Sequence, residues 1–433
     1  MRPATVRDGA HHDVLVVGGG QAGLSMSRHL VGQDVDHVVL ERDTVAHEWR
    51  DGRWDAFTLV TPNWHCRLPA YPYDGPDPNG FMGRDEVYSW VRGYADTFDA
   101  PVAEGVAATR IAPRPGGGFV VQTTAGLVSA GAVVAAVGGY HRPVLPTWAQ
   151  DLPEHIAQIH SHEYRSPDQL PPGPVLVVGT GQSGTQIAED LFLAGRQVHL
   201  SVGRAPRVAR TYRGRDCMTW LAEMGVYDLP VAARGLAKRE STNHYVTGRD
   251  GGRDIDLRAF ARRGMRLYGR ATTVEKGTLR FEPTLGRDLD HADAVAESIK
   301  DDIDRWISSE QIDAPVEARY TPVWRPEVEP ERLDLAGIAA VVWSVGFRAD
   351  WSWLGDLAPE VLDHEGHPRH VRGLSPVPGL SFVGLPWLHT WGSGRFLGIA
   401  QDTAHVAAEI AAWRAGSTWA GPAEQALDLP AAG

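Results

Sequence analysis

Two glycine-rich turns, each directly behind a run of apolar residues, constrain the fold of this chain more than any other feature. Residues 14–17 (Val-Leu-Val-Val) precede Gly-Gly-Gly-Gln-Ala-Gly, and residues 175–178 (Val-Leu-Val-Val) precede Gly-Thr-Gly-Gln-Ser-Gly. The chain has 48 Gly among 433 residues, so the G-x-G-x-x-G spacing alone is weak evidence, but the apolar run before it predicts strand, tight turn and helix in both places. That arrangement sets a pyrophosphate on a helix N-terminus. Two such units predict two bound dinucleotides, a flavin and a nicotinamide, and therefore redox chemistry.

The residue that follows the next expected strand differs between the two units. In the first unit Glu41 follows residues 37–40, where a carboxylate can accept hydrogen bonds from a ribose diol but repels a 2′-phosphate. In the second unit Arg204 follows residues 198–202, where a guanidinium can hold a 2′-phosphate by a charge-assisted contact, and Ser201 could add a hydroxyl. We therefore predict FAD in the first unit and NADPH in the second. The alternative for Arg204, a solvated surface charge, stays open.

Composition excludes several classes of partner. The net charge of −12 offers no basic face for nucleic acid or anionic lipid, and no apolar run reaches the length of a membrane span. The first twelve residues lack the apolar centre of a signal peptide, so we expect a short loose tail and a cytoplasmic protein. The histidines, His11 and His12 included, lack paired ligands at useful spacing, so no metal is expected. A homodimer is left open.

The two cysteines, Cys66 and Cys217, form no C-x-x-C pair. A flavoprotein that exchanges electrons with a disulfide needs two neighbouring thiols. That chemistry is not expected unless these two residues meet in space, and we predict isolated, reduced thiols.

The pattern along the chain predicts an α/β fold with two dinucleotide-binding Rossmann-like domains, the NADPH domain inserted into a discontinuous FAD domain. Residues 1–164 and 326–433 are assigned to the FAD domain, and residues 165–325 to the NADPH domain with an elaboration at about 230–320. Helices are expected near residues 85–98, at 292–312 and at 396–412. Buried strands are expected at 132–137, 339–346 and 380–384, with a small β meander at 118–128.

Several segments resemble the class B flavoprotein monooxygenases. Residues 160–165 (His-Ser-His-Glu-Tyr-Arg) resemble the HSxxYR end of the flavin-containing monooxygenase signature, although Glu154 and Ile156 stand where that signature has Phe and Gly. Tyr164 stands where Baeyer–Villiger enzymes have Trp. Residues 49–50, 53–55 and 59–63 are similar to the flavin-side loop of bacterial relatives of the plant indole-3-pyruvate monooxygenases. Residues 136–139 and 343–347 resemble the two linker motifs of the family, and residues 394–399 the start of its closing helix.

The resemblance implies an FAD- and NADPH-dependent monooxygenase that oxygenates a small organic substrate through a C4a-hydroperoxyflavin. A heteroatom (N or S) or keto-acid substrate is favoured over a Baeyer–Villiger reaction. The cofactor-binding residues expected from the motifs and the resemblance are Gly18, Gly20, Gln21, Ala22, Gly23, Glu41, Arg42, Trp49, Thr61, Val106, Gly138, Gly179, Gly181, Gln182, Ser183, Gly184, Ser201, Arg204, Gly346 and Phe396.

Two further groups are candidates for chemistry and for substrate binding. Asn63 is the candidate catalytic residue, since a neutral amide can donate a hydrogen bond near the peroxide, and its alternative role is a turn residue after Pro62. An aromatic substrate pocket would be formed by Trp64, Trp387, His389 and Trp391, with packing between domains as the alternative. Arg213 or Arg215 could contact NADPH, or be a surface charge. Two other functions stay open: an NADPH:acceptor flavin oxidoreductase or oxidase without substrate oxygenation, and a redox-sensing binding protein without turnover.

Overall fold

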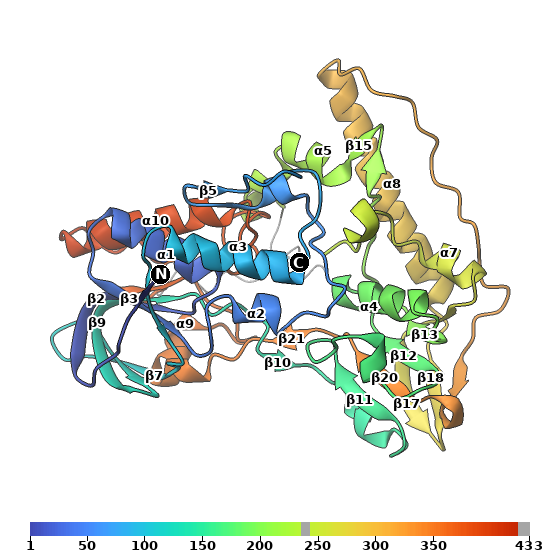
Figure 1. Ribbon diagram of the computed structural model, residues 1–433, viewed down its shortest axis with the longest axis horizontal. Coiled ribbons are helices and arrows are strands. Elements are labelled where there is room, and N and C mark those ends of the chain that lie inside the picture. The colour runs from blue at the N-terminus through green and yellow to red at the C-terminus, as the bar shows by residue number, and fades with distance from the viewer. Residues whose placement is uncertain (235–242, 423–433) are drawn as a thin grey trace.

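The computed structural model describes residues 1–234 and 243–422, which form two lobes side by side (Figure 1). Each lobe is built around a mainly parallel sheet whose central strand leads into one of the two glycine turns. The strands of the first sheet follow the order β1-β6-β3-β2-β9-β8-β7, with β22 also paired to β9, and those of the second the order β11-β20-β12-β13-β16. The predicted α/β class with two Rossmann-like units is confirmed.

The first sheet combines the beginning of the chain with one strand from near its end. Its strands are β1 (Arg2–Pro3), β2 (Ala10–Val17), β3 (His37–Glu41), β6 (Pro101–Glu104), β7 (Ala108–Pro113), β8 (Phe119–Thr123), β9 (Gly126–Ala135) and β22 (Leu380–Phe382). Its helices are α1 (Gln21–Gly32), α2 (His47–Arg50), α3 (Arg84–Asp96), α9 (Ala358–Val361) and α10 (Ile399–Arg414). Helices α1, α3 and α10 cover one face, where Leu24, Val91 and Ile410 belong to one buried cluster.

The expectation of a loose N-terminal tail is wrong. Strand β1 pairs with β6, and β2 begins at Ala10 because the ten-residue strand β9 extends its pairing that far. The His11 ring lies 2.9 Å from the Ser129 hydroxyl, and the His12 ring 2.9 Å from the Asp36 carboxylate. Both histidines therefore have protein partners in the sheet.

The second sheet is entirely parallel and flanked by a smaller antiparallel sheet. Its strands are β11 (Ala157–His160), β12 (Val175–Val178), β13 (Val198–Ser201), β16 (Arg266–Tyr268) and β20 (Ala340–Trp343). Helix α4 (Gln182–Leu193) follows the second glycine turn. The antiparallel sheet consists of β17 (Ala271–Glu275), β18 (Thr278–Phe281) and β19 (Arg332–Asp334).

The chain between β13 and β19 is mostly helical outside its strands. The hairpin β14 (Thr211–Tyr212) and β15 (Arg215–Asp216) and helix α5 (Cys217–Glu223) come before the predicted elaboration at about 230–320, which contains α6 (Val231–Arg234), α7 (Leu257–Arg262) and α8 (Leu285–Ser309). The long helix α8 starts earlier than predicted, where the Glu329 carboxylate accepts hydrogen bonds from the Leu285 and Gly286 amides. Its buried stripe includes Leu289, Ile299, Ile303 and Ile307.

Short paired segments join the lobes. Strands β10 (Arg142–Pro143) and β21 (Phe347–Arg348) form an antiparallel pair between them, and a small hairpin, β4 (Arg67–Leu68) and β5 (Tyr71–Pro72), lies in the long loop of the first lobe. By sheet membership, β11 and β20 belong to the second lobe although they lie outside residues 165–325. The division at 164/165 and 325/326 stays a prediction.

Candidate dinucleotide sites

The two glycine turns have the same geometry. A Cβ added to Gly18 would lie 2.5 Å from the Ala136 carbonyl oxygen, and one added to Gly179 would lie 2.5 Å from the Ser344 carbonyl oxygen. Both glycines have a positive φ, 112° and 102°. Gly23 and Gly184 close the turns, since a Cβ on either would lie within 2.0 Å of the carbonyl oxygen of the first glycine. Each turn is therefore too tight for a side chain at its first and last glycine.

The middle of the first turn is open. A Cβ on Gly20 would meet nothing within 4 Å, and the same holds for Gly138 and Gly139 after the neighbouring strand β9. Gly20 and Gly181 are the N-caps of α1 and α4, and neither helix has a side-chain cap hydrogen bond. The amides in the first turn of each helix therefore have no side-chain cap and could bind a phosphate, and the residues present fit a dinucleotide at both glycine turns.

Glu41 is fixed at the end of β3 beside the first turn. Its carboxylate accepts hydrogen bonds from the Gly19 amide at 2.6 Å and the Asp43 amide at 2.9 Å. Burial raises the pKa of this carboxyl. Val106 lies beside it through an amide hydrogen bond to the Glu41 carbonyl, 2.9 Å long, whereas the exposed Arg42 pairs with Asp43 and Glu48. Glu41 and Val106 thus lie side by side, whereas the Arg42 guanidinium is paired with the carboxylates of Asp43 and Glu48.

Three predicted residues from distant parts of the chain meet at the start of α1. The Trp49 indole donates to the Gln21 side-chain oxygen at 2.9 Å and stacks on Phe396 with ring centres 5.3 Å apart. Arg53, which lies in the resembling loop at 53–55 but is not among the expected cofactor-binding residues, lies 5.2 Å over the Trp49 ring, and burial lowers its pKa. The resemblance over residues 53–55 was the signal that could have found it.

Asn63 is a buried residue that holds its own loop. Its side-chain nitrogen donates to the Asp77 carbonyl at 2.9 Å, and its side-chain oxygen accepts from the Met82 amide at 2.7 Å. Thr61 is half-buried two residues before it. These two hydrogen bonds support the alternative that Asn63 is a structural residue of the turn after Pro62. Its catalytic role stays a prediction.

At the second site, the Ser201 hydroxyl has hydrogen-bond partners within the protein. The Ser201 hydroxyl is buried, donates to the Gly269 carbonyl at 3.0 Å and accepts from the Ala271 amide at 3.1 Å. The hydroxyl therefore joins β13 to the segment after β16, and the expected contact of Ser201 with NADPH is not supported. Gln182 donates to the Val246 carbonyl at 2.5 Å, Ser183 is half-buried, and Gly346 is exposed with a φ of 94°.

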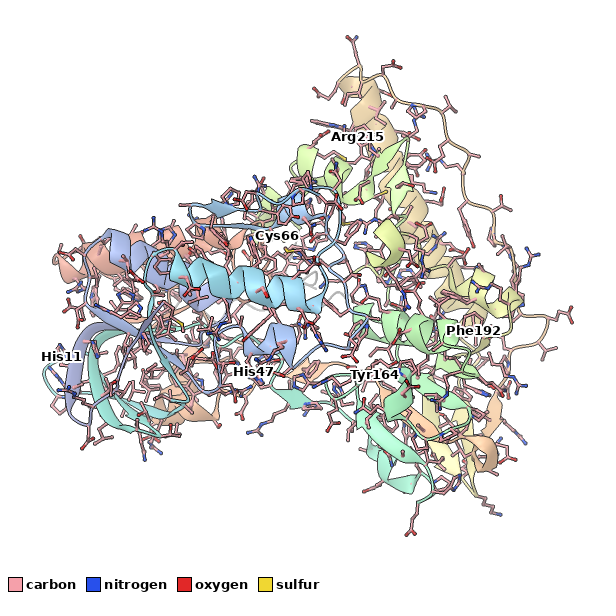
Figure 2. All side chains as sticks on the ribbon, viewed as in Figure 1. His11, His47, Cys66, Tyr164, Phe192 and Arg215 are labelled. Carbon is pink, nitrogen blue, oxygen red and sulfur yellow. The ribbon has the colours of Figure 1, made fainter. Side chains whose placement is uncertain are left out.

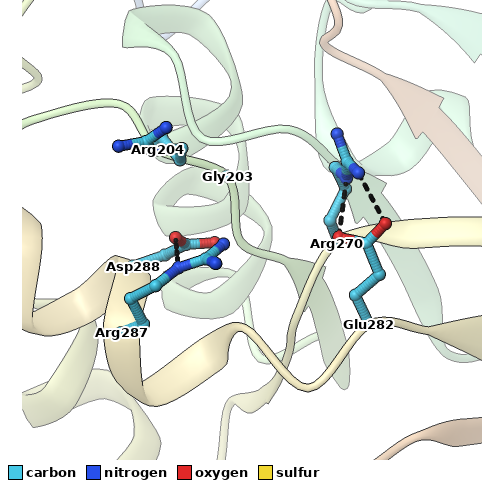
Figure 3. Close-up of a pocket in the computed structure, with 6 residues that line it drawn as sticks. All are labelled: Gly203, Arg204, Arg270, Glu282, Arg287 and Asp288. Atoms are coloured by element: carbon cyan, nitrogen blue, oxygen red, sulfur yellow. Dashed lines mark hydrogen bonds and ion pairs between the residues drawn. The ribbon is translucent and has the colours of Figure 1, made fainter.

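A pocket of about 470 Å³ lies where β13 ends (Figure 3). It is lined by Gly203, Arg204, Arg270, Glu282, Arg287 and Asp288. The Thr180 hydroxyl accepts from the Gly203 amide at 2.9 Å, which ties the glycine turn to the pocket wall. Arg270 pairs with Glu282, and Arg287 with Asp288, while among the described residues Arg204 has no ion-pair partner. Arg270 and Arg287 could not be predicted for this site, because they lie far from Arg204 in the sequence and only the folded chain places all three in one pocket.

Of the four predicted substrate residues, Trp391 contacts Tyr227 directly, while Trp64 and Trp387 are linked to it through other rings. Trp391 stacks on the Tyr227 ring at 4.7 Å and lies 6.3 Å from Trp387, and Trp64 reaches Tyr227 through His65. The His389 carbonyl accepts from the Val231 amide at 2.9 Å. Trp387 and Trp391 are both buried, so this arrangement favours packing between the lobes, and a substrate role stays a prediction.

Arg213 and Arg215, the other candidates for NADPH contact, are held by ion pairs with carboxylates. Arg213 pairs with Asp304, and Arg215 with Glu223 at the outer end of the second lobe (Figure 2). Cys66 and Cys217 are free and buried, and burial raises the pKa of each thiol to about 12.

Comparison with known proteins agrees with this geometry. Residues 15–222 match a family model described as pyridine nucleotide-disulphide oxidoreductase. An uncharacterized oxidoreductase, CzcO-like, of Geobacillus kaustophilus is 28% identical over 92% of this chain and 98% of its own length. The indole-3-pyruvate monooxygenase YUCCA1 of Oryza sativa is 31% identical over 43% of this chain and 47% of its own length. The solved flavin-containing monooxygenase from Stenotrophomonas maltophilia superposes with a TM-score of 0.65 at 18% identity, covering 94% of this chain and 99% of that one.

The chain has the fold of the solved flavin-containing monooxygenases, and its first half is similar to the pyridine nucleotide-disulphide oxidoreductases. Other solved proteins with this fold include an ornithine N-hydroxylase of Kutzneria with reduced FAD and NADP+ (TM-score 0.61, 17% identity) and a steroid monooxygenase bound to NADP (TM-score 0.54, 17% identity). Within residues 1–234 and 243–422, no helix is long and apolar enough to cross a membrane.

Proposed function

We propose that this flavin-containing monooxygenase-like protein uses NADPH and FAD to insert one oxygen atom of O2 into a small organic substrate. FAD would bind at the first glycine turn and NADPH at the second. The observation that carries the NADPH assignment is the arginine-lined pocket beside the second turn. A 2′-phosphate needs cationic donors at the end of the second strand, and Arg204 lies there with Arg270 and Arg287 opposite it.

The first turn suits FAD for the opposite reason. Glu41 offers carboxylate oxygens to a ribose diol, and the guanidinium of its neighbour Arg42 is held by Asp43 and Glu48. The Gln21, Trp49 and Phe396 cluster adds an aromatic wall beside the N-terminus of α1, which suits a planar ring system.

The flavin would supply the redox chemistry and the reaction with O2, so the chain needs little acid–base machinery of its own. The protein would orient the two cofactors and exclude water. Asn63 would contribute by fixing the loop around residues 77–82, and its remaining amide hydrogen would be the polar group offered to the reacting oxygen. The favoured substrates are soft heteroatom nucleophiles or keto acids.

An oxidase or acceptor reductase with the same cofactors is the competing function. Mass spectrometry after turnover under ¹⁸O2 separates the two. We expect one labelled oxygen atom in the product of at least one amine, thioether or keto acid from a screened panel, and one labelled oxygen in water. NADPH consumption that yields only labelled H2O2 with every compound would refute the proposal. Stopped-flow spectroscopy of the reduced protein mixed with O2 would show which compounds accelerate flavin reoxidation.

A further inference from the structure

One short segment of the second lobe is linked both to helix α4, which follows the second glycine turn, and to a loop of the first lobe. Residues 245–253, here called the bridging segment, lie between α4 and the loop of the first lobe that contains Thr61 and Asn63. On the α4 side the Val246 carbonyl accepts from the side chain of Gln182 at 2.5 Å and from that of Gln186 at 3.1 Å. Gln182 is the first residue of α4 and belongs to the second turn. The bridging segment is thus tied to the element that would bind NADPH.

Two ion pairs fix the rest of the bridging segment to the same helix. Arg249 pairs with Asp190 at 2.8 Å, and Arg253 pairs with Glu189 at 2.5 Å. Both carboxylates are buried, and the Tyr164 hydroxyl donates to the second oxygen of Asp190 at 2.8 Å. Buried charges of this kind hold geometry because a displaced carboxylate would lose its partners.

On the other side, Arg210 joins the bridging segment to the first lobe. Its guanidinium donates to the Val60 carbonyl at 2.8 Å and to the Thr247 carbonyl at 3.4 Å. It also pairs with Asp216 at 2.8 Å and lies 4.8 Å over the Phe81 ring. The residue is only 3% exposed. One planar cation therefore holds the backbone just before Thr61 against the backbone of the bridging segment.

The contact is close enough to need glycine. A Cβ on Gly248 would lie 2.1 Å from the Leu59 carbonyl oxygen and 2.7 Å from Phe81, and a Cβ on Gly252 would lie 2.6 Å from Phe81. The φ of Gly248 is −91°, an ordinary value for any residue. Space, and not backbone conformation, requires glycine at 248.

We propose that Arg210 and Gly248 are positioning residues that set the loop at residues 57–66 against α4, and so align the flavin with the nicotinamide. This inference rests on the proposed function. Hydride transfer moves two electrons and one hydrogen nucleus from NADPH, which becomes NADP+, to FAD, and its rate depends steeply on the approach of the two rings. A rigid chain from Gln182 through Val246, Thr247 and Arg210 to Val60 fixes that approach.

The first test uses Arg210→Lys in the FAD-loaded protein. Lysine keeps the charge opposite Asp216, so the protein should fold, but it lacks the second guanidinium nitrogen, which donates to both carbonyls while the others pair with Asp216. The matched control is Arg215→Lys, which alters an exposed ion pair with Glu223 in the same segment. Amide hydrogen exchange is measured with and without NADP+, and the anaerobic rate constant of flavin reduction is measured at saturating NADPH.

In the unsubstituted protein, NADP+ should protect residues 179–186 and also residues 57–66. Arg210→Lys should keep the first protection, lose the second, and slow flavin reduction about tenfold to a hundredfold with the NADPH dissociation constant unchanged. Arg215→Lys should behave as the unsubstituted protein. The inference would be overturned if, in Arg210→Lys, NADP+ still protected residues 57–66 and the rate constant of flavin reduction were unchanged.

Gly248→Ala gives a second, independent test, because it pushes the two segments apart without touching any charge. Its control is Gly337→Ala, since a Cβ there meets nothing within 4 Å. We expect Gly248→Ala to reproduce the Arg210→Lys result, and unchanged flavin reduction would count against the inference. Absence of protection at 179–186 in the unsubstituted protein would overturn the proposed function, and this inference with it. Protection at 179–186 without any at 57–66 would overturn this inference alone.

Discussion

Substituting Arg204 by alanine should separate the two nicotinamide coenzymes. Arg204 lines the pocket beside the second glycine turn, and among the described residues no carboxylate pairs with it. Arg270 and Arg287 line the same pocket but are paired with Glu282 and Asp288. Arg204 is therefore the guanidinium most available to a 2′-phosphate, and its removal should weaken NADPH much more than NADH.

The magnitude follows from the contact. A hydrogen bond to a charged group contributes about 1.5–3 kcal/mol, and a factor of ten in affinity corresponds to about 1.4 kcal/mol. Since Arg204 is exposed and two further guanidiniums line the pocket, we expect the lower part of that range, a rise of about tenfold to thirtyfold in KM for NADPH. KM for NADH should change less than about twofold, because NADH has no 2′-phosphate.

The assay is anaerobic flavin reduction, followed by absorbance, across a concentration series of each coenzyme. Arg280→Ala is the matched control, because Arg280 lies on β18, pairs with Glu275 and does not line the pocket. Raising ionic strength should weaken NADPH binding to the unsubstituted protein more than to Arg204→Ala. Equal losses for NADPH and NADH in Arg204→Ala would refute the assignment of this pocket to the 2′-phosphate.

Three further substitutions test how the surrounding fold is held. Tyr164→Phe removes a hydrogen bond to the buried Asp190 and should lower the free energy of unfolding by about 1.5–3 kcal/mol in urea titrations, whereas no loss would show that Arg249 alone satisfies that carboxylate. Burial raises the pKa of Asp402 to about 6, so the folded protein binds a proton at this carboxyl more tightly than the unfolded chain does. The free energy of unfolding should therefore fall by about 3 kcal/mol as the pH rises from about 4 to 6. Asp402→Asn should flatten that slope. Asn63→Ala should destabilise the protein by about 1–3 kcal/mol through its two hydrogen bonds to the loop at 77–82, and a variant with full stability but wasted NADPH would point to a purely catalytic role.

Helices and strands that are set by residues adjacent in the sequence could be predicted. The helix expected near 85–98 is α3 at Arg84–Asp96, the strand at 339–346 contains β20, and the closing helix at 396–412 corresponds to α10. Hydrophobic period and glycine position determine such elements locally. The amphipathic helix at 292–312 was predicted too short at its start, because its N-terminus is capped by Glu329, a residue far along the chain.

The N-terminal tail and Ser201 show the limit of that reasoning. Residues 1–12 have little apolar pattern, and only pairing with β6 and β9 gives them strand structure. Ser201 occupies the expected position at the end of β13, yet its hydroxyl is satisfied by backbone groups after β16. A sequence motif places a side chain, but it does not say which hydrogen-bond partners the rest of the fold brings to it.

The sequence by itself determined the two dinucleotide-binding units and the charge of the side chain at the end of each unit, negative at Glu41 and positive at Arg204. Both are local properties, since a strand, a tight glycine turn and a helix form from adjacent residues. Glu41 ends the second strand of the first unit, and Arg204 lies three residues after the second strand of the second unit. Only the tertiary structure decided that Arg204 shares a pocket with Arg270 and Arg287, and that Arg210 ties the two lobes together. Those arrangements depend on contacts between segments far apart in the chain, where packing and the pairing of buried charges select one geometry.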